Sequence, residues 1–185
     1  MSFKFISAIS FRQRLLLSCL GLLFAPMAVN ANAATVAEES ELKAAFIYNF
    51  SLFTTWPKID KNLRLCVLGA ETYTSLLAKY EGRSVQGALI HVEQVASAQA
   101  ARNCQLLFVD TNDQANEQTM DAINKALEGA PVLTVGESGK VNPASVMILL
   151  TQDNGRVAFE INQGAATGAG ITLSSKLLKL AKKVH

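Results

Sequence analysis

The segment from Leu63 to Gly82, LRLCVLGAETYTSLLAKYEG, combines the two patterns from which the fold class follows. Its first part is a short apolar run that ends in Gly69, which is typical of a buried strand. Its second part has the spacing of a helix, and Gly82 stands where a helix commonly ends in the left-handed conformation. A strand followed directly by a helix is the repeating unit of a parallel sheet.

The same alternation continues along the chain. Further strands are predicted at ALIHVEQV (88–95), CQLLFVD (104–110) and PVLTVGE (131–137), and helices are predicted at 97–102 and 115–129. Short apolar strands that alternate with helices indicate a mostly parallel sheet with helices on both faces.

The pattern changes after this alternation. Residues 146–162, VMILLTQDNGRVAFEIN, contain two β-runs around an Asn-Gly pair, which is the strongest short-range hairpin signal. A turn or short helix is predicted at 163–174, and a last helix at 174–184. We therefore expect a single-domain α/β fold, a three-layer sandwich with a mostly parallel sheet and an antiparallel hairpin near the C-terminus.

An unusual density of aromatic residues precedes this sheet, in KAAFIYNFSLFTTWP (43–57). Ser40 is a plausible N-cap, residues 34–39 read as a polar lead-in, and Pro57 ends the helix. Because Phe46, Phe50 and Phe53 recur at helical spacing, they are predicted to face the sheet. Two interpretations stay open for Tyr48 and Trp56, namely core packing or a dimer or partner surface, where Tyr and Trp are enriched.

The N-terminal residues have the pattern of a secretory signal peptide at 1–33, with cleavage after Ala33 or Ala31. Basic side chains precede an apolar run that is too short to span a bilayer. Residues 34–185 then form the expected domain, with 14 basic and 15 acidic side chains and a net charge of −1. This charge gives no indication of nucleic-acid binding. We expect an exported, periplasmic protein without a membrane span.

Two cysteines remain after the leader, Cys66 and Cys104, each beside a predicted strand. An even number of cysteines in an oxidising compartment favours a disulfide, provided that the two strands are neighbours. The alternative is a pair of buried free thiols.

Motifs for catalysis are missing from the sequence. It contains no GxxxxGK[ST] phosphate loop, and GESG at 136–139 is not a GxSxG nucleophile elbow. The two histidines, His91 and His185, are far apart and leave no set of zinc ligands. Asp110 ends the third strand, as the phospho-acceptor of a receiver domain does, but the acidic metal ligands of such domains are lacking. We expect no enzymatic activity, no metal and no cofactor.

A binding role would place a small ligand at the carboxyl ends of the parallel strands, where open α/β sheets bind ligands. The loops concerned contain Gly69, Glu71, Thr72, Asp110 and Asn112. A small-molecule sensor domain that serves a membrane signalling or transport system is therefore the alternative to a protein-binding regulator.

Six segments together resemble the successive blocks of the YfiR family of periplasmic regulatory proteins, from about Glu41 to Val184. They are KAAFIYNFSLFTTWP, LRLCVLG, NCQLLFV, PVLTVGE, RVAFEIN and ITLSSKLLKLAKKV. The resemblance implies a dimeric periplasmic repressor that contacts the sensor region of an inner-membrane diguanylate cyclase. It further implies sequestration by an outer-membrane lipoprotein, which relieves the repression, raises cyclic di-GMP and promotes biofilm growth. The family's disulfide cysteines correspond to Cys66 and Cys104.

Overall fold

The computed structural model describes residues 31–69, 71–110 and 117–185. Most of the predicted leader, 1–33, lies outside these residues. A sheet of eight strands runs through the molecule in the order β10-β8-β7-β6-β5-β2-β4-β3. The strands are β2 (Asn62–Gly69), β3 (Ser84–Val85), β4 (Ala88–Val95), β5 (Leu106–Asp110), β6 (Leu133–Glu137), β7 (Ile148–Asp153), β8 (Arg156–Ile161) and β10 (Lys183–Val184).

The centre of this sheet is parallel, as predicted: β4, β2, β5, β6 and β7 all run in the same direction. The predicted hairpin is also confirmed, because β8 returns antiparallel to β7. Its turn has Asn154 and Gly155 at positive φ, 49° and 74°, as a two-residue hairpin turn requires. A small second sheet pairs β1 (Thr54–Thr55) with β9 (Thr172–Leu173).

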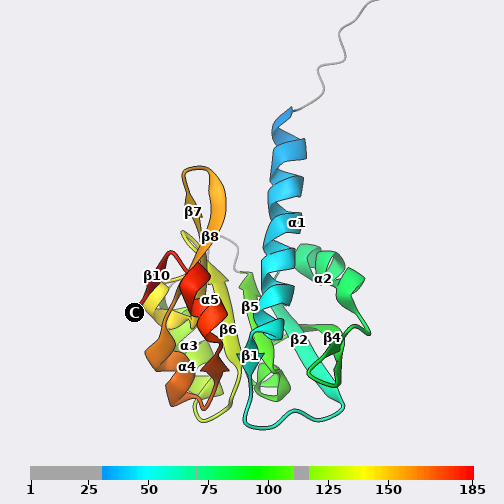
Figure 1. Ribbon diagram of the computed structural model, residues 1–185, viewed down its shortest axis with the longest axis vertical. Helices are drawn as coiled ribbons and strands as arrows, with labels where there is room; N and C mark the ends of the chain where they lie inside the picture. The colour runs from blue at the N-terminus through cyan, green and yellow to red at the C-terminus, as the bar shows by residue number, and fades with distance from the viewer. Residues whose placement is uncertain (1–30, 70, 111–116) are drawn as a thin grey trace, which may run out of the picture.

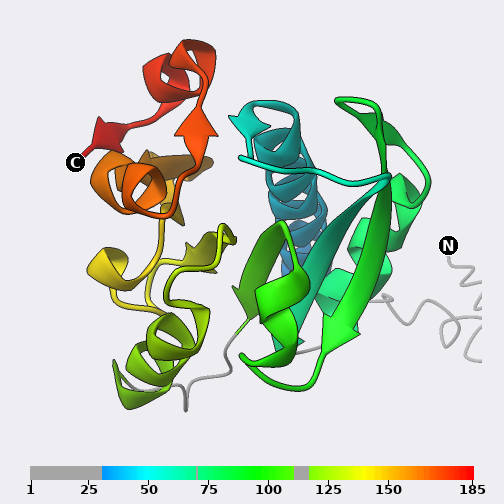
Figure 2. The same ribbon diagram turned by 90° about the horizontal axis from the view of Figure 1, so that it is seen from below.

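Helices cover both faces of the sheet, which confirms the three layers (Figures 1 and 2). One core lies between the sheet and the helices α1 and α2, and it includes Ile47, Phe50 and Leu65. The other lies on the opposite face and includes Leu107 and Ile123. The helical segments are α1 (Ala31–Leu52), α2 (Glu71–Leu77), η2 (Ala78–Tyr80), η3 (Ala100–Asn103), α3 (Glu117–Leu127), η4 (Pro143–Ser145), α4 (Gln163–Gly168) and α5 (Ser175–Leu180).

The first helix, α1, is longer than predicted, and the residues that it buries in the core are not all those predicted from the sequence. It begins at Ala31 rather than after Ser40, so the predicted lead-in at 34–39 is wrong. Residues 31–40 contain no glycine or proline, and their commonest residues are alanine and glutamate, which both favour helix. Ala44, Ile47 and Phe50 are fully buried, whereas Phe46 and Phe53 only pack against the edge of this core.

The last predicted helix is shorter than expected. It ends at Leu180, and Lys183–Val184 then pair with β8 as a parallel edge strand. Within the described ranges, no helix combines the length and the apolar composition that crossing a membrane requires.

Candidate functional site

The order of the parallel strands creates a switch point at their carboxyl ends. From β2 the chain crosses to β4, and then returns past β2 to form β5. Connections that leave in opposite directions open a crevice between two strand ends, and open α/β folds bind their ligands there. In this protein the switch point lies between the end of β2 and the end of β5, where Gly69 and Asp110 are paired neighbours.

Gly69 is required by this close approach. Its φ of +127° is unfavourable for other residues, and a Cβ at this position would collide with the carbonyl oxygen of Asp110. Glu71 and Thr72 begin α2 and are exposed. Asn112, the remaining residue predicted for a ligand loop, lies outside the described residues. Gly69 and Asp110 are therefore adjacent, while ligand binding by the loops that follow them stays a prediction.

Beside this switch point lies a row of alternating charges, here called the edge cluster, formed by Glu39, Lys43, Glu137, Lys140 and Asp110. The Lys140 ammonium is 3.0 Å from Asp110 Oδ1 and 3.2 Å from Glu137 Oε2. Glu137 also pairs with Lys43 on α1, whose Nζ lies 2.6 Å from Glu39 Oε1. Asp110 is 4% exposed and Lys43 is 7% exposed, so much of the cluster is buried.

The carboxylate partners offset the effect of burial on the pKa of the two lysines. Burial by itself would lower the pKa of Lys43, but hydrogen bonds to Glu137 and Glu39 hold it above its ordinary value. The same balance raises the pKa of Lys140, where Asp110 and Glu137 oppose the effect of burial. The hydrogen bond from Lys43, followed by that from Gln152, lowers the pKa of Glu39.

The edge cluster joins three parts of the fold. Glu39 and Lys43 belong to α1, and Glu137 ends β6. Gln152 on β7 donates from Nε2 to Glu39 Oε1 at 2.9 Å, so α1 is tied to the hairpin as well. A hollow of about 260 Å³ lies between them, lined by Lys43, Glu137, Ser138, Leu150, Thr151 and Gln152. The arrangement is suited to positioning α1 and the hairpin, because each of its charges is already paired with an opposite charge.

Sequence reasoning missed Lys43, Glu137 and Lys140. One signal was available: Lys43 lies on the stripe of α1 that continues through the buried residues Ile47 and Phe50. A lysine on a buried stripe requires an acidic partner. The identity of that partner depends on contacts between segments that are 94 residues apart.

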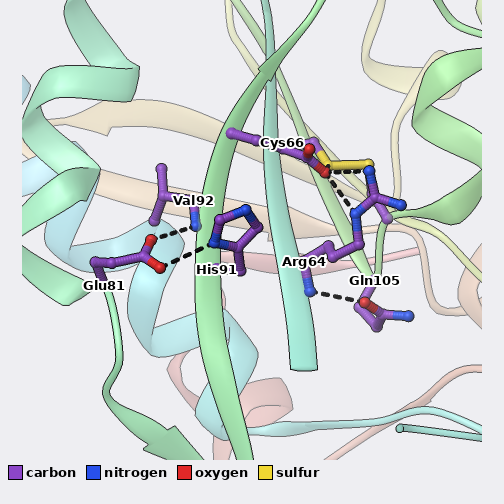
Figure 3. Close-up of polar contacts among 8 residues, drawn as sticks. Arg64, Cys66, Glu81, His91, Val92 and Gln105 are labelled. Atoms are coloured by element: carbon purple, nitrogen blue, oxygen red, sulfur yellow. Dashed lines mark hydrogen bonds and ion pairs between the residues drawn. A yellow bond between two sulfur atoms is a disulfide. The ribbon is translucent and has the colours of Figure 1, made fainter. Parts of the chain in front are cut away.

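The predicted disulfide is present between Cys66 on β2 and Cys104 just before β5, with Cα atoms 6.1 Å apart. The two cysteines are 0% and 2% exposed, so the bridge is an internal link between neighbouring strands. Glu93 Oε1 lies 3.3 Å from Cys66 Sγ and 2.5 Å from Arg64 Nη2, which gives this carboxylate a charged partner (Figure 3). Among the described residues, Cys66, Cys104 and Glu93 form the one group with metal-ligand spacing, and its sulfurs are occupied by the disulfide.

The two aromatic residues predicted for a partner surface differ in their surroundings. Trp56 is 5% exposed and donates from Nε1 to the Gln105 carbonyl at 2.7 Å. It therefore packs in the core, which is one of the two interpretations that the sequence left open. Tyr48 is half-buried, and its ring stacks on Tyr80 with centroids 4.2 Å apart.

Tyr48 contributes to a mixed aromatic and basic patch. The Arg83 guanidinium lies 5.7 Å from the Tyr48 ring centroid and 5.3 Å from that of Tyr80. Lys79 lies 5.4 Å from the Tyr80 ring centroid, and Leu52, one helical turn after Tyr48, is 39% exposed. We call Tyr48, Leu52, Lys79 and Arg83 the Tyr48 surface.

The model of the family described as YfiR/HmsC-like matches residues 40–182, which is most of the chain. The chain belongs to the YfiR/HmsC-like family. Membership in this family supports a general role as a periplasmic regulator that contacts a membrane protein. The buried disulfide agrees with an oxidising compartment.

Two solved structures have a similar fold. One is an ABC domain from Streptococcus pneumonia in complex with L-Trp, with 10% identity over 80% of this chain and a TM-score of 0.52. The other is a conserved domain protein from Vibrio cholerae, with 13% identity over 79% of this chain and a TM-score of 0.54. This chain spans 60% of each of those chains. At such identities the similarity concerns the fold alone.

Proposed function

We propose that this protein represses or modulates a membrane-bound diguanylate cyclase from the periplasm, through direct contact with the sensor region of that enzyme. The observation that carries the proposal is the match of residues 40–182 to the YfiR/HmsC-like family. The proposed assembly is a homodimer that an outer-membrane lipoprotein can sequester. The effect on the cell would be a change in cyclic di-GMP and in biofilm growth, without catalysis by this chain.

The Tyr48 surface is the proposed contact region for this partner. Tyrosine and arginine are enriched at the energetic centres of protein interfaces. Arg83 lies against the Tyr48 ring, and Leu52, one helical turn after Tyr48, is exposed. The ring of Tyr48 also stacks on Tyr80, so its removal would affect folding as well as association. Leu52→Asp and Arg83→Glu are therefore the better variants, because both side chains are exposed.

A pull-down from detergent-solubilised envelope tests the proposal, with tagged residues 34–185 as bait and mass spectrometry as the readout. We expect recovery of a membrane protein with a cyclase domain, and loss of that protein with Leu52→Asp/Arg83→Glu. Arg156→Glu, an exposed charge reversal on β8, is the matched control and should retain the partner. Recovery of a histidine kinase or a transport component instead would overturn the cyclase assignment.

A small-molecule sensor is the second candidate function, favoured by the switch-point position of Gly69 and Asp110. A ligand that binds there should raise the melting temperature of the wild-type protein. Thr72→Arg, an exposed substitution in the first turn of α2, should abolish this shift. If no periplasmic extract raises the melting temperature while the pull-down still recovers the membrane protein, the results would favour the regulator function alone.

A further inference from the structure

A second, larger depression lies at the opposite edge of the sheet, at the amino-terminal ends of β2, β5 and β6. Figure 2 views the molecule from the side of this edge. The depression has a volume of about 680 Å³, within the range of small-molecule sites. It is lined by Lys58, Asp60, Lys61, Asn62, Arg64, Arg102, Asn103, Cys104, Gln105 and Pro131. None of these residues belongs to the edge cluster or to the Tyr48 surface, so we call this feature the amino-edge depression.

The lining of the amino-edge depression is basic, with four cationic side chains and one carboxylate. Arg64 is compensated by Glu93, 2.5 Å away. Lys58 and Asp60 are 3.7 Å apart, and both are more than three-quarters exposed, so this pair is weak. Lys61 has no carboxylate partner among the described residues. An excess of positive charge therefore remains within the depression.

Arg102 supplies a positioned cation. Its Nη1 donates to the carbonyl oxygens of Ala126 and Glu128, at 2.5 and 3.2 Å, near the end of α3. These bonds orient the guanidinium through one nitrogen but do not neutralise it, because both acceptors are uncharged carbonyls. Within the described part of the chain, its remaining N–H groups have no acceptor. Donors of this kind are held in place before a ligand arrives, which lowers the entropic cost of binding.

Gln105 adds a neutral donor of fixed orientation. Its Oε1 accepts from the backbone N–H of Arg64 at 2.7 Å, so the amide nitrogen faces away from that strand (Figure 3). Its backbone carbonyl accepts from Trp56, which anchors the residue to the core. Asn62 and Asn103 contribute two further amides to the lining. Convergent cations and amide donors around an open depression are the chemistry that recognises phosphate oxygens.

We propose that the amino-edge depression binds a phosphate monoester, with Lys61 and Arg102 supplying the charge and the Gln105 amide supplying a further hydrogen bond. A phosphate monoester carries nearly two negative charges and three acceptor oxygens at neutral pH, which matches more than one cationic donor. The phosphate could belong to a free metabolite or to a lipid headgroup, since both present the same group. The proposal is independent of the cyclase assignment, because the site needs no partner protein.

Titration of the purified protein with glycerol 3-phosphate at constant ionic strength, followed by calorimetry, tests the proposal. We expect saturable binding that weakens about tenfold or more in Lys61→Glu, as loss of a charged hydrogen bond implies. Lys61 is exposed, so this variant should keep the wild-type melting temperature. Lys176→Glu, an exposed charge reversal on α5, should bind like wild type.

Vesicles of phosphatidylcholine with and without phosphatidic acid form the second arm. Binding of glycerol 3-phosphate assigns a free phosphate ligand, and binding only to the phosphatidic acid vesicles assigns a headgroup. Either result supports the site if Lys61→Glu weakens the binding about tenfold or more and Lys176→Glu leaves it unchanged. Absence of binding in both arms would overturn the proposal, as would binding that Lys61→Glu and Lys176→Glu weaken equally.

Discussion

The Lys43 ammonium on α1 is paired with the Glu137 carboxylate at the end of β6, and both groups are shielded from solvent. Removal of one partner from a buried ion pair leaves an uncompensated charge. Lys43→Met should therefore lower the free energy of unfolding by about 3 kcal/mol, at the lower end of the range for such pairs because Lys140 still contacts Glu137. Urea denaturation followed by circular dichroism measures the change.

Lys79 provides the matched control for this prediction. It lies 3.9 Å from Glu41 and both side chains are exposed, so Lys79→Met should change stability by less than about 0.5 kcal/mol. In a double-mutant cycle, Lys43→Met/Glu137→Gln should cost less than the sum of the two single variants. Equal losses for Lys43→Met and Lys79→Met would show that the buried pair has no special role.

Gly69→Ala should destabilise the protein strongly. The positive φ alone costs about 1–3 kcal/mol, and the collision with the Asp110 carbonyl adds to it by forcing β2 and β5 apart. Gly82 also has a positive φ, 72°, but a Cβ added there would meet no atom within 4 Å, so Gly82→Ala should show the conformational cost alone. Melting curves of the two variants compare these effects. Similar melting temperatures would mean that the strands relax around the added methyl group.

The contribution of Glu39 to stability should depend on pH. Its pKa in the folded protein lies below the ordinary value of 4.5, because Lys43 and Gln152 donate to its carboxylate. A depressed carboxyl pKa stabilises the fold fully above the unfolded-state pKa, and this stabilisation is lost as the pH falls through the folded-state pKa. At pH 7 the melting temperature of the wild type should therefore be higher than that of Glu39→Gln. This difference in melting temperature should shrink as the pH falls below about 4.

The magnitude of this effect should be small, about 0.3–0.5 kcal/mol, as for other helical i,i+4 pairs. Melting curves between pH 3 and pH 7 measure it. Glu38→Gln removes an exposed carboxylate from the same turn and should leave the melting temperature at pH 7 unchanged. A difference between wild type and Glu39→Gln that grows toward low pH would contradict the assigned ion pair.

The disulfide should act as a structural link. Its removal in Cys66→Ala/Cys104→Ala should lower the free energy of unfolding by about 2–4 kcal/mol, as expected for a bridge that closes a loop of this length. Since both cysteines are buried, mild reductant and iodoacetamide should label the native protein slowly and the urea-unfolded protein at once. Rapid labelling of the native protein would instead indicate an accessible, redox-active bridge.

Local patterns were sufficient to predict the alternation of strands and helices and the Asn154-Gly155 hairpin. Each depends on residues that are close in the sequence: an apolar run forms a buried strand wherever it pairs, and Asn-Gly favours a tight turn in any hairpin. The meeting of Gly69 and Asp110 was predictable as well, because the carboxyl ends of parallel strands share one edge. The length of α1 was missed, since the helix preference of residues 31–40 does not by itself distinguish a helix from a polar lead-in.

The burial of Trp56, the edge cluster and the basic lining around Arg102 required the assembled fold. An aromatic residue at a helix end can face the core or solvent, and the choice for Trp56 depends on the Gln105 carbonyl nearly fifty residues away. The sequence around a charged residue does not indicate which distant residue will pair with it, because such ion pairs form between segments that the strand order brings together. Lys43 meets Glu137 only because α1 crosses the carboxyl end of β6, a contact set by packing across the whole sheet.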